Sequence, residues 1–269
     1  MNLLRELNPR GCERRSRRRF IRRTYHSMGP KYMWHADGYD KRKPFGVALS
    51  GCIDGFSRKV LWLECGPTNN NPRVIAQYFL KCVRNLGVIP MRLRTDCGTE
   101  NGIMAAIQCT LRHHHHDYYS GVSSHMYGSS MTNQRVLVVH IKKGKVSVLD
   151  GAICRPAGYF NGSHEHQCLL RFCLVDVIQK DLDECVSLWD GHRIRPSRTA
   201  SCPGGVPNEL YYLPHSSSRS LMMNTLACSG DPLSWMKILQ FAVHDLAPGT
   251  VDLRLNRQNV MLFLRQACL

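Results

Sequence analysis

A β-hairpin in the first third of the chain constrains the fold more than any other feature. Strand-like runs cover residues 47–53 and 60–64. The Asp54-Gly55 pair that begins the stretch between them is a strong turn signal. The two runs therefore predict a hairpin, and any fold proposed for this chain has to contain it.

A helix with clear end signals follows the hairpin. Asn71 can cap it, Pro72 suits its first position and Gly87 is a natural stop. Apolar residues recur between these ends at three- and four-residue intervals, which places them on one helix face: Val74, Ile75, Tyr78, Phe79, Cys82, Val83 and Leu86.

Further elements are expected on both sides of this unit. Residues 32–37 and 91–95 predict short strands, and residues 103–111 and 169–189 predict helices. The order strand, hairpin, helix, strand, helix predicts an α/β fold, with a mixed sheet and helices packed on it. The segment from His113 to Asn133 contains four consecutive histidines and is expected to be a mobile loop.

The charge of the chain points to a polyanionic partner. Lys and Arg number 36 against 20 Asp and Glu, a formal net charge of +16. This excess favours nucleic acid, because each neutralised phosphate releases counterions. Residues 1–28 form a basic leader that is either a nucleic-acid contact or import signal, or a solvated tail. Its candidate nucleic-acid-binding residues are Arg18, Arg19, Arg22 and Arg23.

Composition also bears on the compartment. No apolar stretch reaches the roughly 18 residues needed to span a bilayer. The chain has 13 cysteines, no Cys-x-x-Cys pair and no apparent signal peptide. We expect free thiols in a reducing compartment, with no membrane partner, and therefore a nuclear or otherwise intracellular protein.

Two aspartates lie at the ends of predicted strands. Asp37 ends the first strand and Asp96 follows the strand at 91–95. Carboxylates at neighbouring strand ends can converge on one hard cation such as Mg²⁺, which prefers oxygen ligands. Paired cations can activate an attacking oxygen during phosphoryl transfer. The spacing taken alone favours the interpretation that both aspartates are turn or cap residues.

Four motifs surround these acids in a fixed order: YMWHADGYDKRKPFG, GCIDGFSRKVLWLE, TNNNP and LRTDCGTENG. Together they resemble the catalytic core of retroviral-type integrases and related transposase-derived proteins. The resemblance covers about residues 31–135 and resumes at 182–198 with WDGHRIRPSR. It implies a ribonuclease-H-like mixed sheet flanked by helices, DNA cutting and joining, Mg²⁺ or Mn²⁺ as cofactor, DNA as partner and self-association. It makes Asp37 and Asp96 the catalytic metal ligands.

The third acid of the family pattern is missing. The family places a glutamate after Asn-Gln-Arg and one apolar residue, whereas here Leu137 stands in that position. A neutral side chain cannot ligate a hard cation, so we expect weakened metal binding. Asp40, Glu100, Asp150 and Glu165 are the acids available to substitute, although Glu100 is expected to cap the helix at 103–111. The candidate nucleic-acid contacts here are Asn133, Gln134 and Arg135.

Residues 136–158 are atypical for this family, because they have a strand-like composition where the family has an amphipathic helix. One interpretation is a genuine hairpin that turns at 142–145. The other is a shifted reading frame, since a one-base shift with suitable codons lets residues 135–157 be re-read with Arg-Glu followed by Trp-Trp. We expect the ribonuclease-H-like fold to be disrupted after residue 135.

These observations predict a basic leader at 1–28, an integrase-like core at 29–200 and a poorly defined C-terminal segment at 201–269. Three functions stay open. The chain is a polynucleotidyl transferase with impaired catalysis, a non-catalytic nucleic-acid-binding or scaffold protein derived from a transposable element, or the translated product of a disabled gene. The missing glutamate favours the second and third over turnover.

Overall fold

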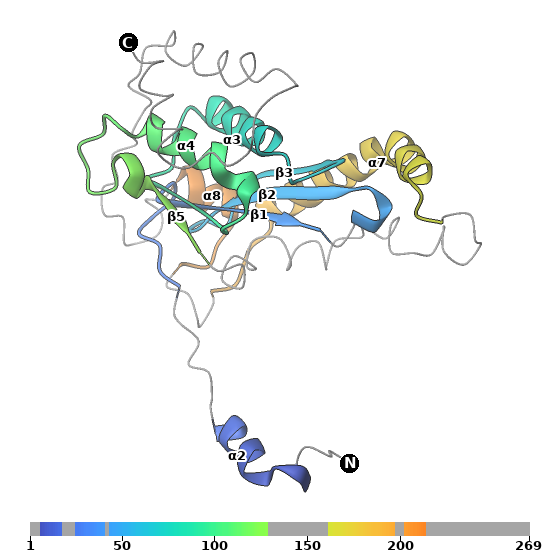
Figure 1. Cartoon of the computed structure of the whole chain (residues 1–269). Coiled ribbons are helices and arrows are strands. Elements are labelled where there is room, and N and C mark those ends of the chain that lie inside the picture. Colours follow the sequence, from blue (N-terminus) through green and yellow to red (C-terminus); the bar gives the residue numbers. More distant parts are fainter. Residues whose placement is uncertain (1–5, 18–24, 41–42, 129–160, 197–201, 214–269) are drawn as a thin grey trace.

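The computed structural model describes residues 6–17, 25–40, 43–128, 161–196 and 202–213 (Figure 1). The strands are β1 Met33–Tyr39, β2 Ala48–Asp54, β3 Val60–Gly66, β4 Arg92–Thr95 and β5 His125–Tyr127. The α-helices are α2 Pro9–Arg17, α3 Pro72–Leu86, α4 Gly102–Leu111, α7 His164–Gly191 and α8 Pro207–Tyr212. Short 3₁₀ turns are η1 Lys43–Phe45, η2 Thr99–Asn101 and η3 Gly121–Ser124.

The strands form one mixed sheet in the order β3-β2-β1-β4-β5. β2 runs antiparallel to β1 and β3, whereas β4 runs parallel to β1 and β5 parallel to β4. Antiparallel neighbours need only a tight turn, and the parallel neighbours are joined through helices. The predicted hairpin, the mixed sheet and the ribonuclease-H-like fold class are confirmed for the described residues.

One face of the sheet packs on α3 and α4, which lie together over it (Figure 1). Trp34 of β1, Leu93 of β4 and Phe79 of α3 are fully buried. Trp34 and Trp62 each stand edge-on to Phe79, with ring centroids 6.3 and 6.5 Å away. Burial contributes roughly 1.5–3 kcal/mol for a side chain such as Leu or Phe, so this cluster dominates the stability of the core.

The opposite face of the hairpin packs on α7. Ile178 and Leu182 of this helix are each 1% exposed and contact Val47, Leu49 and Ile53. The predicted helix at 169–189 is therefore confirmed and extends further at both ends. Because both faces are covered, β2 is buried along its whole length.

The local end signals of α3 act as the sequence predicts. Asn71 Oδ1 accepts a hydrogen bond from Arg73 N at 3.0 Å, and Pro72 takes the first helical position. Gly87 adopts the left-handed conformation, with φ of 65°, and its N–H donates to Val83 O at 2.9 Å. A residue with a Cβ would be strained there, so glycine ends the helix at little cost.

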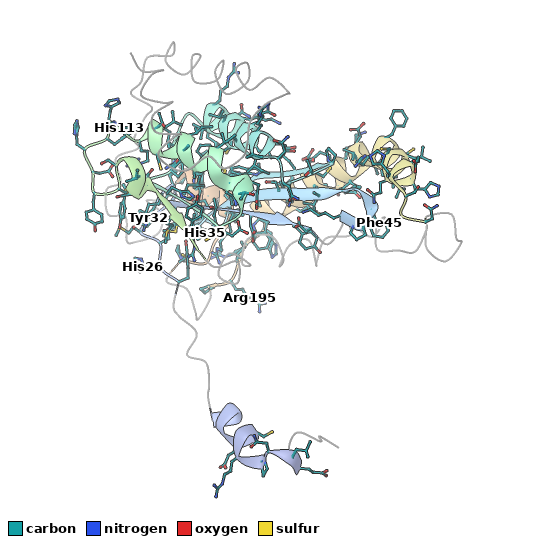
Figure 2. All side chains as sticks on the ribbon, viewed as in Figure 1. His26, Tyr32, His35, Phe45, His113 and Arg195 are labelled. Atoms are coloured by element: carbon teal, nitrogen blue, oxygen red, sulfur yellow. The ribbon has the colours of Figure 1, made fainter. Side chains whose placement is uncertain are left out.

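Ordered structure precedes β1, since α2 covers Pro9–Arg17 and Tyr25 packs on β1 through a 2.8 Å hydrogen bond to His35 Nε2. One expectation is wrong. The segment after His113 is not simply a loop, because it holds η3 and β5. A fully buried Arg112 guanidinium pairs with Asp117 and anchors the histidine run, whose first member lies at the periphery (Figure 2).

Residues 202–213 pack on the tip of the hairpin. Arg58 Nη2 donates to Pro203 O at 2.5 Å, and the Cys202 thiol donates to Gly55 O at 3.5 Å. Leu210 and Tyr211 of α8 are buried. The described part of the core therefore reaches into the segment after residue 200.

Several predicted features lie outside the described residues: the disruption after residue 135, Leu137, Asn133, Gln134, Arg135, Arg18, Arg19, Arg22 and Arg23. In the part of the chain that the structure describes, no helix has both the length and the apolar character needed to cross a membrane.

Candidate active site

The two predicted acids lie at the same edge of the sheet. The parallel β1–β4 ladder ends with His35 paired to Arg94, and Asp37 and Asp96 follow two residues further along each strand. Parallel strands that are neighbours bring equivalent positions together. Burial raises the pKa of Asp37, and the nearby charge of Asp96 raises it further.

The surroundings of Asp37 disfavour its ionised form. Partial burial is the largest cause, and the nearby charges of Asp96, Asp40 and Glu100 add to it. Together they raise the pKa of Asp37 from 3.8 to about 6, against the hydrogen bond from Gly38 N, which lowers it. A carboxylate crowded by other carboxylates gains from any cation that neutralises the group.

The Asp96 side chain is held from one side. Its Oδ1 accepts hydrogen bonds from Asn101 Nδ2 at 2.7 Å and from Gly98 N at 3.2 Å. The Oδ1 of Asp37 accepts from Gly38 N at 2.9 Å. Within the described residues no hydrogen bond reaches the Oδ2 atom of either aspartate. One oxygen of each carboxylate is therefore available to a ligand.

The acids that were candidates to replace the missing glutamate have different surroundings. Asp40 accepts hydrogen bonds from Asn69 Nδ2 at 2.6 Å and from Lys43 Nζ at 2.8 Å. Both of its carboxylate oxygens are therefore already bonded to neighbouring side chains. Glu165 lies in the first turn of α7, and Asp150 is outside the described residues. Glu100 does not cap the following helix. Its carboxylate folds back over Gly98.

The donor set fits a hard divalent cation held by two carboxylates. Among the residues that the structure describes, no three or more His, Cys, Asp or Glu side chains gather in a way that could hold a metal ion. Mg²⁺ is commonly bound through one or two carboxylates, with waters and substrate phosphates completing its shell. Asp37 and Asp96 meet this requirement, and they are the residues that would hold the ion.

Asp54, from the second motif, has a structural task. It is fully buried and accepts hydrogen bonds from Lys31 N, Phe56 N, Ser57 N and Ser57 Oγ at 2.6 to 3.2 Å. Burial nevertheless raises its pKa to about 6. The Asp-x-x-Ser-Arg pattern is therefore the internal scaffold of the hairpin turn, and it lies away from the Asp37–Asp96 edge.

Two basic residues on β4 were missed by sequence reasoning. Arg92 and Arg94 lie on one face of this strand. Arg94 is two residues before Asp96, whereas Arg92 begins the strand and pairs with Met33. The Arg92 guanidinium lies over the ring of Tyr119, 4.7 Å from its centroid. The alternation Arg-Leu-Arg-Thr just before Asp96 was the signal available, since period two places both arginines on one face.

A mixed sheet in this order, with one carboxylate inside β1 just past the parallel ladder and the other directly after β4, defines the ribonuclease-H-like class of cores. The integrase core domain model matches residues 24–212, and the chain belongs to this family. A solved relative in fold is the HTLV-2 integrase catalytic core domain in complex with magnesium, in a trimeric form. It is 16% identical, covers 69% of this chain and 99% of its own, and superposes with a TM-score of 0.42. No curated protein matches the chain.

Proposed function

We propose that this protein is a DNA-binding relative of metal-dependent strand transferases, with Asp37 and Asp96 as its metal ligands and catalytic acids. One observation carries the proposal. Asp37 and Asp96 lie at equivalent positions, two residues past the last pair of the parallel β1–β4 ladder, in a chain of the integrase core family. Hard cations are bound by such paired oxygens, and phosphoryl transfer depends on them.

The residues around the acids divide the remaining work. A bound Mg²⁺ or Mn²⁺ would supply Lewis-acid stabilisation of the phosphate and of the attacking oxygen. Asp37 and Asp96 would hold the ion, while Arg94, two residues before Asp96 on β4, would neutralise backbone phosphates that approach the same edge. Such contacts fix the position of the nucleic acid without reading its sequence.

Impaired catalysis is the second part of the proposal. Leu137 stands where the family pattern has its third acid, and in the described residues no third ligand joins the two aspartates. Losing one of three carboxylates weakens both affinity for the metal and its positioning. The alternative is a protein that binds nucleic acid or acts as a scaffold without turnover. The net charge of +16 favours nucleic-acid binding under both alternatives, and the missing third acid favours the one without turnover.

DNA as partner places the protein in the nucleus or otherwise inside the cell, and self-association is expected for strand transfer. These inferences follow from the proposed activity. The salt dependence of DNA affinity tests DNA binding independently of catalysis. Phosphate contacts give a steep linear fall of log affinity with log salt concentration. An affinity that does not change with salt concentration would contradict DNA binding through Lys and Arg contacts to phosphates.

The deciding experiment is an oligonucleotide cleavage and joining assay with Mn²⁺. It compares the natural chain with Asp37→Asn, Asp96→Asn and Leu137→Glu. We expect weak activity that both asparagine variants abolish and that Leu137→Glu raises by about tenfold or more. Activity that survives Asp37→Asn would contradict the assignment of the acids. Steep salt-dependent DNA binding without any cleavage would support the non-catalytic alternative.

A further inference from the structure

Asn101 makes a contact that its place in the fold does not require. The residue is 6% exposed, and its Nδ2 donates to Asp96 Oδ1 across 2.7 Å. The two residues are five positions apart, on either side of the turn that carries Gly98 and Glu100. A buried amide that donates to a charged carboxylate makes a hydrogen bond of the stronger, charge-assisted kind.

The ordinary role of an asparagine at this position is excluded by the geometry. Asn101 occupies the N-cap position of α4, where asparagine usually accepts a hydrogen bond from an N–H of the first turn. Its side chain makes no capping hydrogen bond here. The amide is committed to Asp96 instead, so helix capping does not explain the residue.

The contact determines which oxygen of Asp96 is left for a ligand. Asn101 Nδ2 and Gly98 N both engage Oδ1, one from a side chain and one from the backbone. Two donors on one oxygen limit rotation of the carboxylate and leave Oδ2 available. A neutral donor is suited to this task, because a second carboxylate would repel Asp96 and an apolar residue would leave it without one of its donors.

We propose that Asn101 is a positioning residue for Asp96, which orients the carboxylate so that Oδ2 faces the cation shared with Asp37. The inference rests on the proposed function and adds to it a residue outside the set of metal ligands. Groups that hydrogen-bond to metal ligands orient them, and their loss typically lowers metal affinity by about 10- to 100-fold.

The test is calorimetric titration of the full chain with Mn²⁺, together with its thermal unfolding. The variants are Asn101→Leu, which has the same branching and no donor, and Asn101→Ser, which keeps a shorter donor. Gln108→Leu is the matched control: Gln108 is a fully buried amide on the same helix whose Nε2 donates to Pro90 O at 2.9 Å. Asp96→Asn reports on the proposed metal site itself.

We expect Asn101→Leu to weaken Mn²⁺ binding by about tenfold or more, Asn101→Ser to lie between it and the natural chain, and Gln108→Leu to change affinity by less than about twofold despite similar loss of stability. Natural affinity in Asn101→Leu, or in Asn101→Ser should the leucine variant not fold, would overturn the inference if Asp96→Asn abolishes binding. Natural affinity in Asp96→Asn would overturn the proposed function, and the inference with it.

Discussion

Lys59 and Asp190 form a buried ion pair across 131 residues of sequence, with Lys59 Nζ 2.7 Å from Asp190 Oδ2. The other carboxylate oxygen accepts from Val60 N at 2.9 Å. Next to it, Trp189 Nε1 donates to Arg58 O at 2.9 Å. Trp189 and Asp190 at the end of α7 therefore attach that helix to the β2–β3 hairpin. They bring the hairpin motif and the WDGHRIRPSR segment, which are far apart in sequence, into contact.

Removing one member of this pair should destabilise the fold strongly. The side chains of Lys59 and Asp190 are 14% and 5% exposed, so Asp190→Ala leaves an ammonium group buried without its counter-ion. We expect a loss of about 3 kcal/mol in the free energy of unfolding, measured by urea denaturation. The exposed pair of Lys81 and Glu64 is the control, and Lys81→Ala should cost no more than about 1 kcal/mol. Equal losses in the two variants would contradict the prediction.

Gly55 is required by packing rather than by backbone conformation. A Cβ there would collide with the Tyr25 hydroxyl and lie 2.9 Å from Met33 O, while the left-handed residue of the turn is Arg58, with φ of 64°. Gly55→Ala should therefore lower the free energy of unfolding by about 3 kcal/mol, because backbone has to move. Adding Tyr25→Phe removes the closest of the three obstacles, the others being Met33 O and His35 Nε2, and should recover part of this loss. No recovery in the double variant would show that Tyr25 is not an obstacle.

Gly38, beside Asp37, should also resist substitution. A Cβ there would lie 2.5 Å from Asn69 Nδ2, the amide that donates to Asp40. We expect Gly38→Ala to cost about 1–2 kcal/mol of stability through displacement of Asn69. Gly102→Ala is the control, since nothing lies within 4 Å of its Cβ position and its φ is −61°. That change should be neutral or stabilise by up to about 1 kcal/mol, and a similar loss in both variants would be the contrary result.

Stability should depend on pH through Asp37. Its pKa is raised from 3.8 to about 6, so the folded metal-free protein holds this proton more tightly than the unfolded chain. The stabilisation that comes from protonated Asp37 is complete below about pH 4 and is lost as the pH rises through about 6. Asp37→Asn should therefore exceed the natural chain in stability by about 1 kcal/mol at about pH 7.5, after allowing for solvent screening, and lose this advantage at about pH 4.

Bound metal should make the natural chain more stable than Asp37→Asn at about pH 7.5. A cation that binds the ionised carboxylate stabilises the natural chain at about pH 7.5, much less at about pH 5, and stabilises Asp37→Asn at neither. Thermal unfolding with and without MgCl₂ at both pH values measures the effect. A magnesium-dependent shift that is the same in Asp37→Asn would place the ion elsewhere.

Local sequence signals predicted the elements whose stability is decided within a short window. Asn71, Pro72 and Gly87 set the ends of α3 through contacts with residues no more than four positions away. The hairpin and the position of Asp96 directly after a strand were likewise predicted, because alternation and turn chemistry are local properties. The strand of Asp37 was predicted to end at that residue, whereas β1 runs on to Tyr39. Each of these signals has its physical partner inside the segment that carries it.

The tertiary structure decided what depends on distant partners. β5 has three residues and exists because it pairs with β4, so no periodicity announces it. The histidine segment is anchored by a buried Arg112, although its composition predicts a loop. The amide of Asn101 turns to Asp96 rather than to its own helix, and the Trp189-Asp190 motif closes on the hairpin. Sequence alone determined the elements with local signals, such as the hairpin and the ends of α3. Burial and pairing in three dimensions determined the short β5 strand and the contacts of Arg112, Asn101 and Asp190, because these depend on neighbours that the chain brings together only when it folds.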